Sequence, residues 1–252
     1  SERAKSVNPD FKITPENIND IAEICKKLDG LPLAIELASA RTKLFTPKMI
    51  LSRLGNKFNI LKSSSKKYSE RHQTLKQAIS WSYELLTEGE KKIFRWMSVF
   101  SGGFSFEAAE NIFPGMKKQI PDITDGIEAL IDKSLLRRKD DSNDEPRFYM
   151  LETIREFSSE CIEEDEKDIL MTLYVNYYLS LAEEAEPYLS KEGMEYWLNK
   201  LEHDEFNLRK SLNHAFEYKN SDTALRMCGA LLKYRIIRGN LVEGLREIMK
   251  AI

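Results

Sequence analysis

The chain has 252 residues, of which 42% are hydrophobic and 31% are charged, a composition typical of soluble globular proteins. No apolar run approaches the roughly 20 residues that a membrane helix needs, and the N-terminus lacks the apolar core of a signal peptide. We therefore expect a cytoplasmic protein with no membrane segment. The cysteines Cys25, Cys161 and Cys228 lie far apart, which argues against a zinc knuckle or a disulfide framework.

The net charge of −3 is distributed unevenly. Residues 1–69 carry a net +6, residues 70–157 a net −3 and residues 158–252 a net −6. The basic end would suit a nucleotide or an acidic neighbouring domain. The middle of the chain lacks the basic surface expected of a DNA-binding domain.

The first predicted helices are marked by their end signals. Thr14-Pro15 and Thr46-Pro47 each place a capping hydroxyl before a proline, which favours the first helical position. Gly30 is expected to end the first helix in the left-handed conformation, and a second helix is predicted over 32–43. Residues 55–70 lose this periodicity and gain serine and lysine, as linkers do.

The middle of the chain predicts a winged helix. Thr87 and Glu90 form a capping-box pattern, Ser105 is expected to cap a short helix, and a third helix is predicted near 123–133. Two short strands, 134–140 and 147–151, flank a polar turn. Three helices followed by a β-hairpin are the order of a winged helix-turn-helix.

From about residue 165 onward the pattern is helical, with an interruption at Pro187. One helix is predicted over 196–218, and two more over 221–236 and 240–252. Such helices joined by short polar turns favour stacked antiparallel pairs. The mainly α chain is thus divided into an N-terminal tail (1–13), a small helical domain (14–57), a linker (58–70), a winged-helix domain (71–162) and a truncated TPR-like region of antiparallel helix pairs (163–252).

Three segments together carry a family resemblance. They are GLPLAIELASAR at 30–41, the stretch from RHQTLKQAISWSYELL to FEAAENIF at 71–113, and IEALIDKSLL with RFYMLETIREFSSE within 127–160. In this order they resemble STAND-class signalling ATPases, specifically the predicted ATPases of bacterial LuxR-type transcriptional regulators. NB-ARC and apoptotic AP-ATPases are more distant. The stretch at 202–245 resembles the first helices of their TPR-like sensor.

The resemblance implies a position after a P-loop domain in a longer protein. The sequence contains no G-x-x-x-x-G-K-[ST] motif, so it has no loop to cradle nucleotide phosphates or their Mg²⁺. We expect no enzymatic activity and no cofactor in this chain alone, whereas the longer protein is expected to bind ADP or ATP with Mg²⁺. Its own P-loop domain is the expected partner in cis.

The same resemblance assigns Gly30, Leu31 and Pro32 to the adenine side of the nucleotide, because the family's G-x-P proline packs on the base. A rigid apolar ring at a helix start is a suitable wall for a purine. A purely structural explanation is equally available: Gly30 ends one helix and Pro32 begins the next.

The phosphate side departs from the family pattern. The family's Met-His-Asp triplet, whose histidine reaches the β-phosphate of ADP, is Met150-Leu151-Glu152 here. Leucine cannot donate a hydrogen bond to phosphate. Arg155 or the pair Arg71-His72 could replace that contact, although solvated or capping roles also suit these residues.

Direct DNA binding is an alternative function, since the third helix of a winged helix can read DNA. That stretch contains Asp122, Asp125, Glu128 and Asp132, and carboxylates repel phosphates. Arg137, Arg138 and Lys139 on the wing could contact phosphate. The charge pattern nevertheless argues against direct DNA binding.

The leading hypothesis is a nucleotide-controlled switch in a transcriptional regulator, with ATP exchange releasing the helical and winged-helix parts to oligomerise. An unknown inducer or protein would act on the C-terminal helices. A plain protein-interaction scaffold is a further alternative. If one unbroken helix spans them, His203 and His214 share a helix face about 16 Å apart, by the 1.5 Å rise, which is too far for one metal ion.

Overall fold

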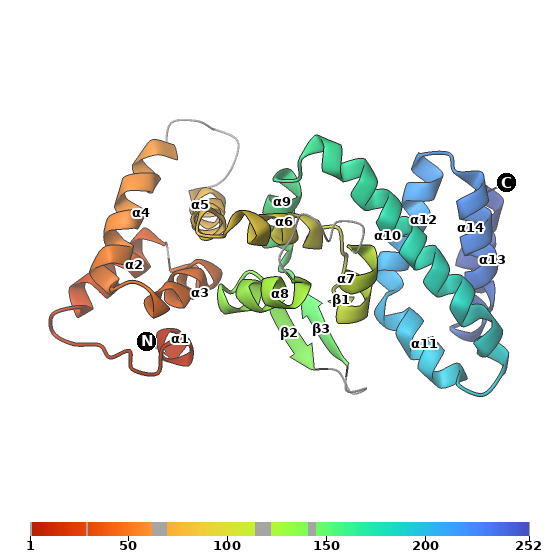
Figure 1. Cartoon of the computed structure of the whole chain (residues 1–252), viewed down its shortest axis with the longest axis horizontal. Helices are drawn as coiled ribbons and strands as arrows, with labels where there is room; N and C mark the ends of the chain where they lie inside the picture. Colours follow the sequence, from red (N-terminus) through yellow and green to blue (C-terminus); the bar gives the residue numbers. More distant parts are fainter. Residues whose placement is uncertain (1, 29, 62–69, 114–121, 141–144, 252) are drawn as a thin grey trace. The chain divides into compact units, whose positions relative to one another are not determined.

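The computed structural model describes residues 2–28, 30–61, 70–113, 122–140 and 145–251, with the backbone alone for 55–61 and 70–73. As the sequence predicts, the fold is mainly α-helical with one small sheet (Figure 1). The chain forms two compact units, and their boundary runs through the winged-helix region. Unit 1 comprises Ser1–Arg95, Gln119–Arg138 and Met150–Cys161, and unit 2 comprises Trp96–Lys118, Lys139–Tyr149 and Ile162–Ile252.

Unit 1 begins with a group of short helices in which α2 packs on α4, and α3 packs on both α1 and α5. The buried face of α3 is lined mostly by alanines, whose small side chains allow neighbouring helices to approach closely. The elements of this part are α1 (Glu2–Val7), α2 (Ile18–Lys27), α3 (Pro32–Ala40), the 3-10 helix η1 (Arg41–Lys43) and α4 (Pro47–Leu61).

Three expectations for this part are corrected. Residues 2–7 of the expected tail form α1, whose Ala4 is buried. Helix α2 begins at Ile18 rather than after Thr14, because the Asn17 side chain accepts a 2.9 Å bond from the Thr14 amide and closes a turn there. Helix α4 continues to Leu61, into the predicted linker, and residues 62–69 lie outside the described residues.

Helices α5, α6 and α9 of unit 1 meet through aromatic rings. Tyr83 of α5 lies 5.5 Å from Phe94 of α6 and 5.8 Å from Phe157 of α9, measured between ring centroids. The Ser158 hydroxyl donates a 2.7 Å bond to the Phe94 carbonyl, which fixes α9 against α6. The bounds are α5 (Glu70–Glu84), α6 (Glu88–Met97, crossing into unit 2), α8 (Ile123–Asp132) and α9 (Glu152–Glu160).

The small sheet has the strand order β1-β3-β2. Strand β1 (Phe104–Ser105) pairs antiparallel with β3 (Pro146–Tyr149), with Phe104 opposite Phe148. Strand β2 (Arg137–Asp140) and β3 are the predicted hairpin strands, whereas β1 is too short to produce an alternating pattern in the sequence. Ser105 caps α7 (Phe106–Ile112), as predicted, by accepting a 3.1 Å bond from the Ala108 amide.

The C-terminal helices of unit 2 pack as successive antiparallel neighbours (Figure 1). Helix α10 contacts α12 and α13, and α13 contacts α14. The single helix predicted over 196–218 is wrong, because Asp204 separates two helices there. The elements are α10 (Glu164–Ala185), the 3-10 helix η3 (Glu186–Ser190), α11 (Met194–His203), α12 (Glu205–Glu217), α13 (Ser221–Ile237) and α14 (Leu241–Ala251).

The capping box at the start of α6 gives a stability test. The Glu90 carboxylate accepts from the Thr87 amide at 2.8 Å, and the Glu90 amide donates to the Thr87 hydroxyl at 3.3 Å. We expect Thr87→Ala to lower the free energy of unfolding by about 1 kcal/mol, because it removes a helix cap. Urea denaturation of this variant beside Thr124→Ala, an exposed threonine in the first turn of α8, measures the effect; equal losses would contradict it.

Candidate functional site

The turn between α2 and α3 has the geometry that the sequence predicts. Gly30 has a φ of +66°, and the chain enters α3 through Leu31 in an extended conformation, with Pro32 at the first helical position. Gly30 and Pro32 are both exposed, so this surface is available to a group outside the chain. Its role at an adenine base stays a prediction.

The phosphate-side candidates are not brought to a common site by the described contacts. The Arg155 guanidinium forms a 2.9 Å bond with the Glu152 carboxylate, one turn earlier on α9. Leu151 precedes this helix as its N-terminal capping position, without a side-chain cap. The side chains of Arg71 and His72 lie outside the described residues.

A buried polar network in unit 2 is the most organised cluster that sequence reasoning missed. Its central members are Arg147 on β3, Asp204 at the break between α11 and α12, and Asn207 on α12. Their exposed fractions are 6%, 1% and 0%. Because an unpaired buried polar group is costly, the bonds among these side chains decide whether this part of the fold is stable.

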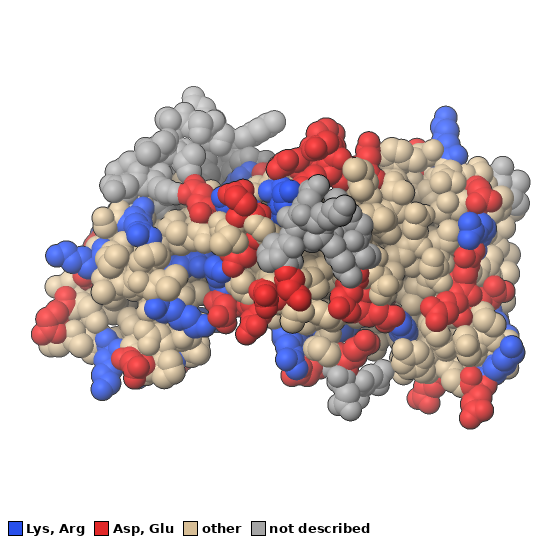
Figure 2. Space-filling model, in the orientation of Figure 1, with Lys and Arg blue, Asp and Glu red and all other residues tan. Residues whose placement is uncertain are grey.

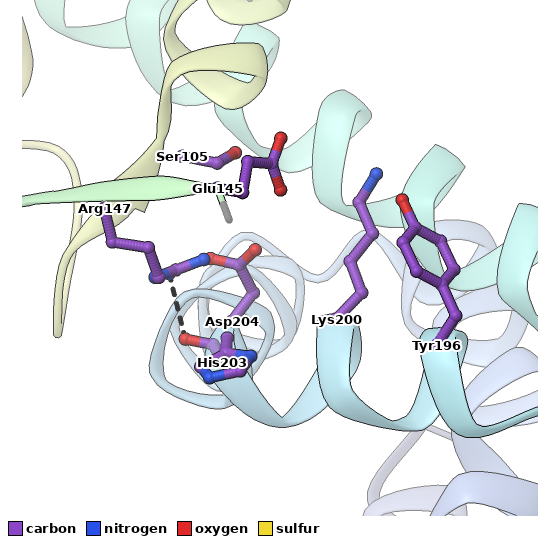
Figure 3. Close-up of a pocket in the computed structure, with 7 residues that line it drawn as sticks. All are labelled: Ser105, Glu145, Arg147, Tyr196, Lys200, His203 and Asp204. Carbon is purple, nitrogen blue, oxygen red and sulfur yellow. Dashed lines mark hydrogen bonds and ion pairs between the residues drawn. The ribbon is translucent and has the colours of Figure 1, made fainter. Parts of the chain in front are cut away.

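The Asp204 carboxylate holds the centre of this network through one oxygen. Its Oδ1 accepts a 2.9 Å bond from the Arg147 guanidinium, a 2.8 Å bond from the Asn207 amide and a longer 3.4 Å bond from the Tyr178 hydroxyl. Arg147 also donates to the His203 carbonyl at 3.0 Å (Figure 3). The wing strand β3 is therefore tied to the turn between two C-terminal helices.

Asn207 extends the network to the segment that leads into β1. Its side-chain oxygen accepts from the Ser101 amide at 2.7 Å and from the Tyr174 hydroxyl at 2.9 Å. Its side-chain nitrogen donates to the Gly103 carbonyl at 2.8 Å. One asparagine thus connects α10, α12 and the turn before β1, using its donors and its acceptor together.

Close packing surrounds these polar groups. The Phe100 and Phe104 rings stack at 4.2 Å, and Phe100 also meets the Tyr174 ring edge-on at 5.9 Å. Gly102 has a φ of +74°, and an added Cβ would lie 2.6 Å from the Phe206 ring of α12. A side chain at this position would therefore require the exposed Phe206 ring to move.

The charges in the network stabilise one another. Burial acts to lower the pKa of Arg147, but the Asp204 charge and hydrogen bond outweigh burial and raise that pKa above its usual value. Burial, followed by the Asp204 charge, raises the pKa of the Tyr178 hydroxyl well above its usual value. Both groups keep their protons throughout the physiological range.

A small polar pocket borders this network (Figure 3). Its volume is about 50 Å³, which is room for a few water molecules rather than a nucleotide. Lys200 on its wall donates a 2.7 Å bond to Glu107 of α7, a second charged link between the C-terminal helices and the winged-helix region. The pocket is lined by Ser105, Glu145, Arg147, Tyr196, Lys200, His203 and Asp204.

The break at Asp204 also removes the assumption that His203 and His214 share one helix face. Among the described residues, no group of three or more His, Cys, Asp or Glu side chains could hold a metal ion. In that same part of the chain, no helix is long and apolar enough to span a bilayer.

The exposed surface of α8 is acidic. Asp122, Asp125, Glu128 and Asp132 are all exposed, and Figure 2 shows acidic side chains gathered over this helix. Asp132 forms a 3.0 Å ion pair with Lys43 of η1, within unit 1. The four carboxylates singled out in the sequence therefore lie on the solvent-exposed surface of α8.

A family model for the winged helix-turn-helix domain matches residues 86–163. Residues 86–163 are a winged helix-turn-helix domain. The matched segment begins just before the Thr87 cap of α6 and includes α7, α8, the hairpin and α9. The winged helix that the sequence predicts is thereby confirmed, and Arg147 is a residue of its wing.

The sequence similarity to known relatives extends beyond this winged-helix domain. "Putative HTH-type transcriptional regulator Rv0890c" of Mycobacterium tuberculosis is 31% identical over 245 residues, which are 97% of this chain. "Putative HTH-type transcriptional regulator Mb0914c" of Mycobacterium bovis gives the same values. The chain spans only 28% of the length of each relative. Both names agree with the bacterial regulators that the sequence resembles.

A solved structure gives a weaker likeness. It is a STAND protein with a tetratricopeptide repeat sensor, PH0952 from Pyrococcus horikoshii, 16% identical, with coverage of 86% of this chain and 34% of that one. The TM-score is 0.37, which does not establish a shared fold.

The centre of the network gives a second stability test. We expect Asp204→Ala to lower the free energy of unfolding by about 3 kcal/mol, because it leaves the Arg147 guanidinium buried without its counter-charge. Chemical denaturation measures this loss. Glu183→Ala is the matched control, since it breaks an exposed pair with Arg226 and should cost less than about 1 kcal/mol. A loss no larger than that of the control would count against a central role for Asp204.

Proposed function

We propose that this chain is the regulatory region of a transcriptional regulator, in which C-terminal helices control a winged-helix domain. Similarity across 97% of the chain to HTH-type regulators carries this proposal. The buried bonds from Asp204 and Asn207 to the wing and the β1 segment support it, since they provide a physical connection through which one part could influence the other.

Control by a nucleotide is the finer part of the proposal. The sequence has no phosphate loop, so ADP or ATP with Mg²⁺ would be held by a P-loop domain elsewhere in a longer protein. The exposed turn Gly30–Pro32 would then close on the adenine. Its rigid proline at the start of α3 and its solvent exposure are what support that role.

Within unit 1, ion pairs would transmit the movement of this turn to elements of the winged-helix domain. Glu36 of α3 pairs with Arg137 of β2 at 3.0 Å, and Lys43 pairs with Asp132 of α8 at the same distance. Exposed pairs of this kind contribute little stability, so they can exchange partners when a nucleotide changes. Exchange of ADP for ATP would release these contacts and permit assembly with further copies.

A nucleotide titration tests this proposal. We expect the full-length protein to bind ADP by calorimetry and the 252-residue chain not to bind it. In the full-length protein, Pro32→Ala should weaken ADP binding about fivefold, because the base loses an apolar wall. Pro47→Ala is the matched control, a second proline at a first helical position. A full-length protein that binds no adenine nucleotide would refute the switch.

Direct DNA binding is a second candidate, favoured by the winged-helix match and by the exposed wing residues Arg137, Arg138 and Lys139. The acidic surface of α8 opposes it, because a winged helix usually presents this helix to the major groove.

Fluorescence anisotropy with duplex DNA separates the two candidates. We expect no binding by this chain at low salt, where phosphate contacts are strongest. If binding is observed, replacement of Arg137 and Arg138 by alanine should reduce it, whereas Lys5→Ala in α1 should not. Salt-sensitive binding that depends on the wing arginines would favour the second candidate.

A further inference from the structure

We propose that Asp204 is a two-position switch, which either holds the wing through Arg147 or caps helix α12. The regulatory role of this switch rests on the function proposed above. The proposal identifies the contact that C-terminal helices would use to hold or release the winged-helix domain.

The Asp204 side chain does not cap the helix that follows it. It occupies the position before α12, where aspartate ordinarily accepts a bond from the second or third amide of the helix. Here it makes no such cap. Its Oδ1 is directed instead to the Arg147 guanidinium and the Asn207 side-chain amide. The usual partner of this carboxylate, the N-terminal turn of α12, is therefore displaced by the wing.

The backbone of Asp204 has the geometry of a helix end. Its φ of −102° and ψ of 13° resemble those of Lys133 and Tyr218, which end α8 and α12, because Asp204 also ends α11. A capping residue is typically extended. A change from wing-holding to capping would thus rotate the backbone at this residue, and the angle between α11 and α12 would change with it.

Burial makes a change of partner costly for both charged groups. Arg147 and Asp204 are almost fully buried, so neither can leave its partner without a new one or without reaching water. Asp204 would gain the free amides of α12, and Arg147 would regain water as the wing separates. A buried polar network in which all hydrogen bonds are either made or broken together has two distinct states, as a switch requires.

Hydrogen exchange of the 252-residue chain, read by mass spectrometry or NMR, tests the switch. In Arg147→Met the wing loses its partner, whereas Asp204 keeps its carboxylate and can turn to cap α12. Amide exchange in β1 and β3 should then rise about tenfold or more, whereas exchange at the first-turn amides of α12, Phe206 and Asn207, should fall. Loss of stability alone would raise exchange in both places, so the opposite signs identify the switch.

Asp204→Ser provides an independent variant. Serine caps helices about as well as aspartate but is shorter and uncharged, so it should release the wing and still protect α12. Asp204→Ala can do neither, and should raise exchange in both segments. The double variant Arg147→Met/Asp204→Ser should exchange in the wing no faster than either single variant, because all remove the same contact.

Arg235→Met is the matched control. Arg235 is 1% exposed and pairs with Glu205 and Glu247, which joins α12, α13 and α14 through a second buried arginine. Its loss should raise exchange in these helices and leave β1 and β3 unchanged. Unchanged wing exchange in Arg147→Met, or increased exchange at Phe206 and Asn207 in both Arg147→Met and Asp204→Ser, would overturn the proposal. No nucleotide is present, so this result is independent of the ADP titration.

Discussion

One carboxylate oxygen sets the arrangement of unit 2. Asp204 Oδ1 accepts bonds from the wing, from α12 and, at longer distance, from α10, inside a region where Asp204 itself is only 1% exposed. A buried charge with good partners contributes little net stability, but it strongly disfavours any packing in which those partners are missing. The interaction therefore specifies one register between the wing and the C-terminal helices, around which the aromatic rings can pack closely.

The two units use charge differently. In unit 1, the pairs between α3 or η1 and the winged-helix elements involve side chains that remain partly exposed, so water can replace them at little cost. In unit 2, the corresponding link is buried and its breakage needs compensation. In unit 1, the winged-helix elements are thus held by partly exposed ion pairs that exchange easily. In unit 2, they are held by a buried pair that is either made or broken. This difference suits a regulatory region.

Much of this fold follows from local signals in the sequence. The Thr46 and Thr87 caps, the left-handed Gly30 and the strands of the wing depend on neighbouring residues, and the structure has them as predicted. Strand β1 and the break at Asp204 depend on distant partners, so they were missed. Asp204 lies within an otherwise helical pattern, and its partner Arg147 lies 57 positions earlier, beyond the reach of any local signal. The sequence offered one hint at Arg147: it is a charged residue next to the aromatic residue Phe148 in a predicted strand.

The break at Asp204 also sets the rotational phase of α12. In a continuous helix, successive side chains advance by about 100° around the axis, so the preceding helix would dictate which face of α12 meets α13. Because α12 begins directly after a residue that is bound to β3, the contact with the wing determines how α12 is rotated about its own axis. The orientation of α12, and with it the packing of α13 on α12 and of α14 on α13, then depends on a strand of the winged-helix domain rather than on the helix immediately before it.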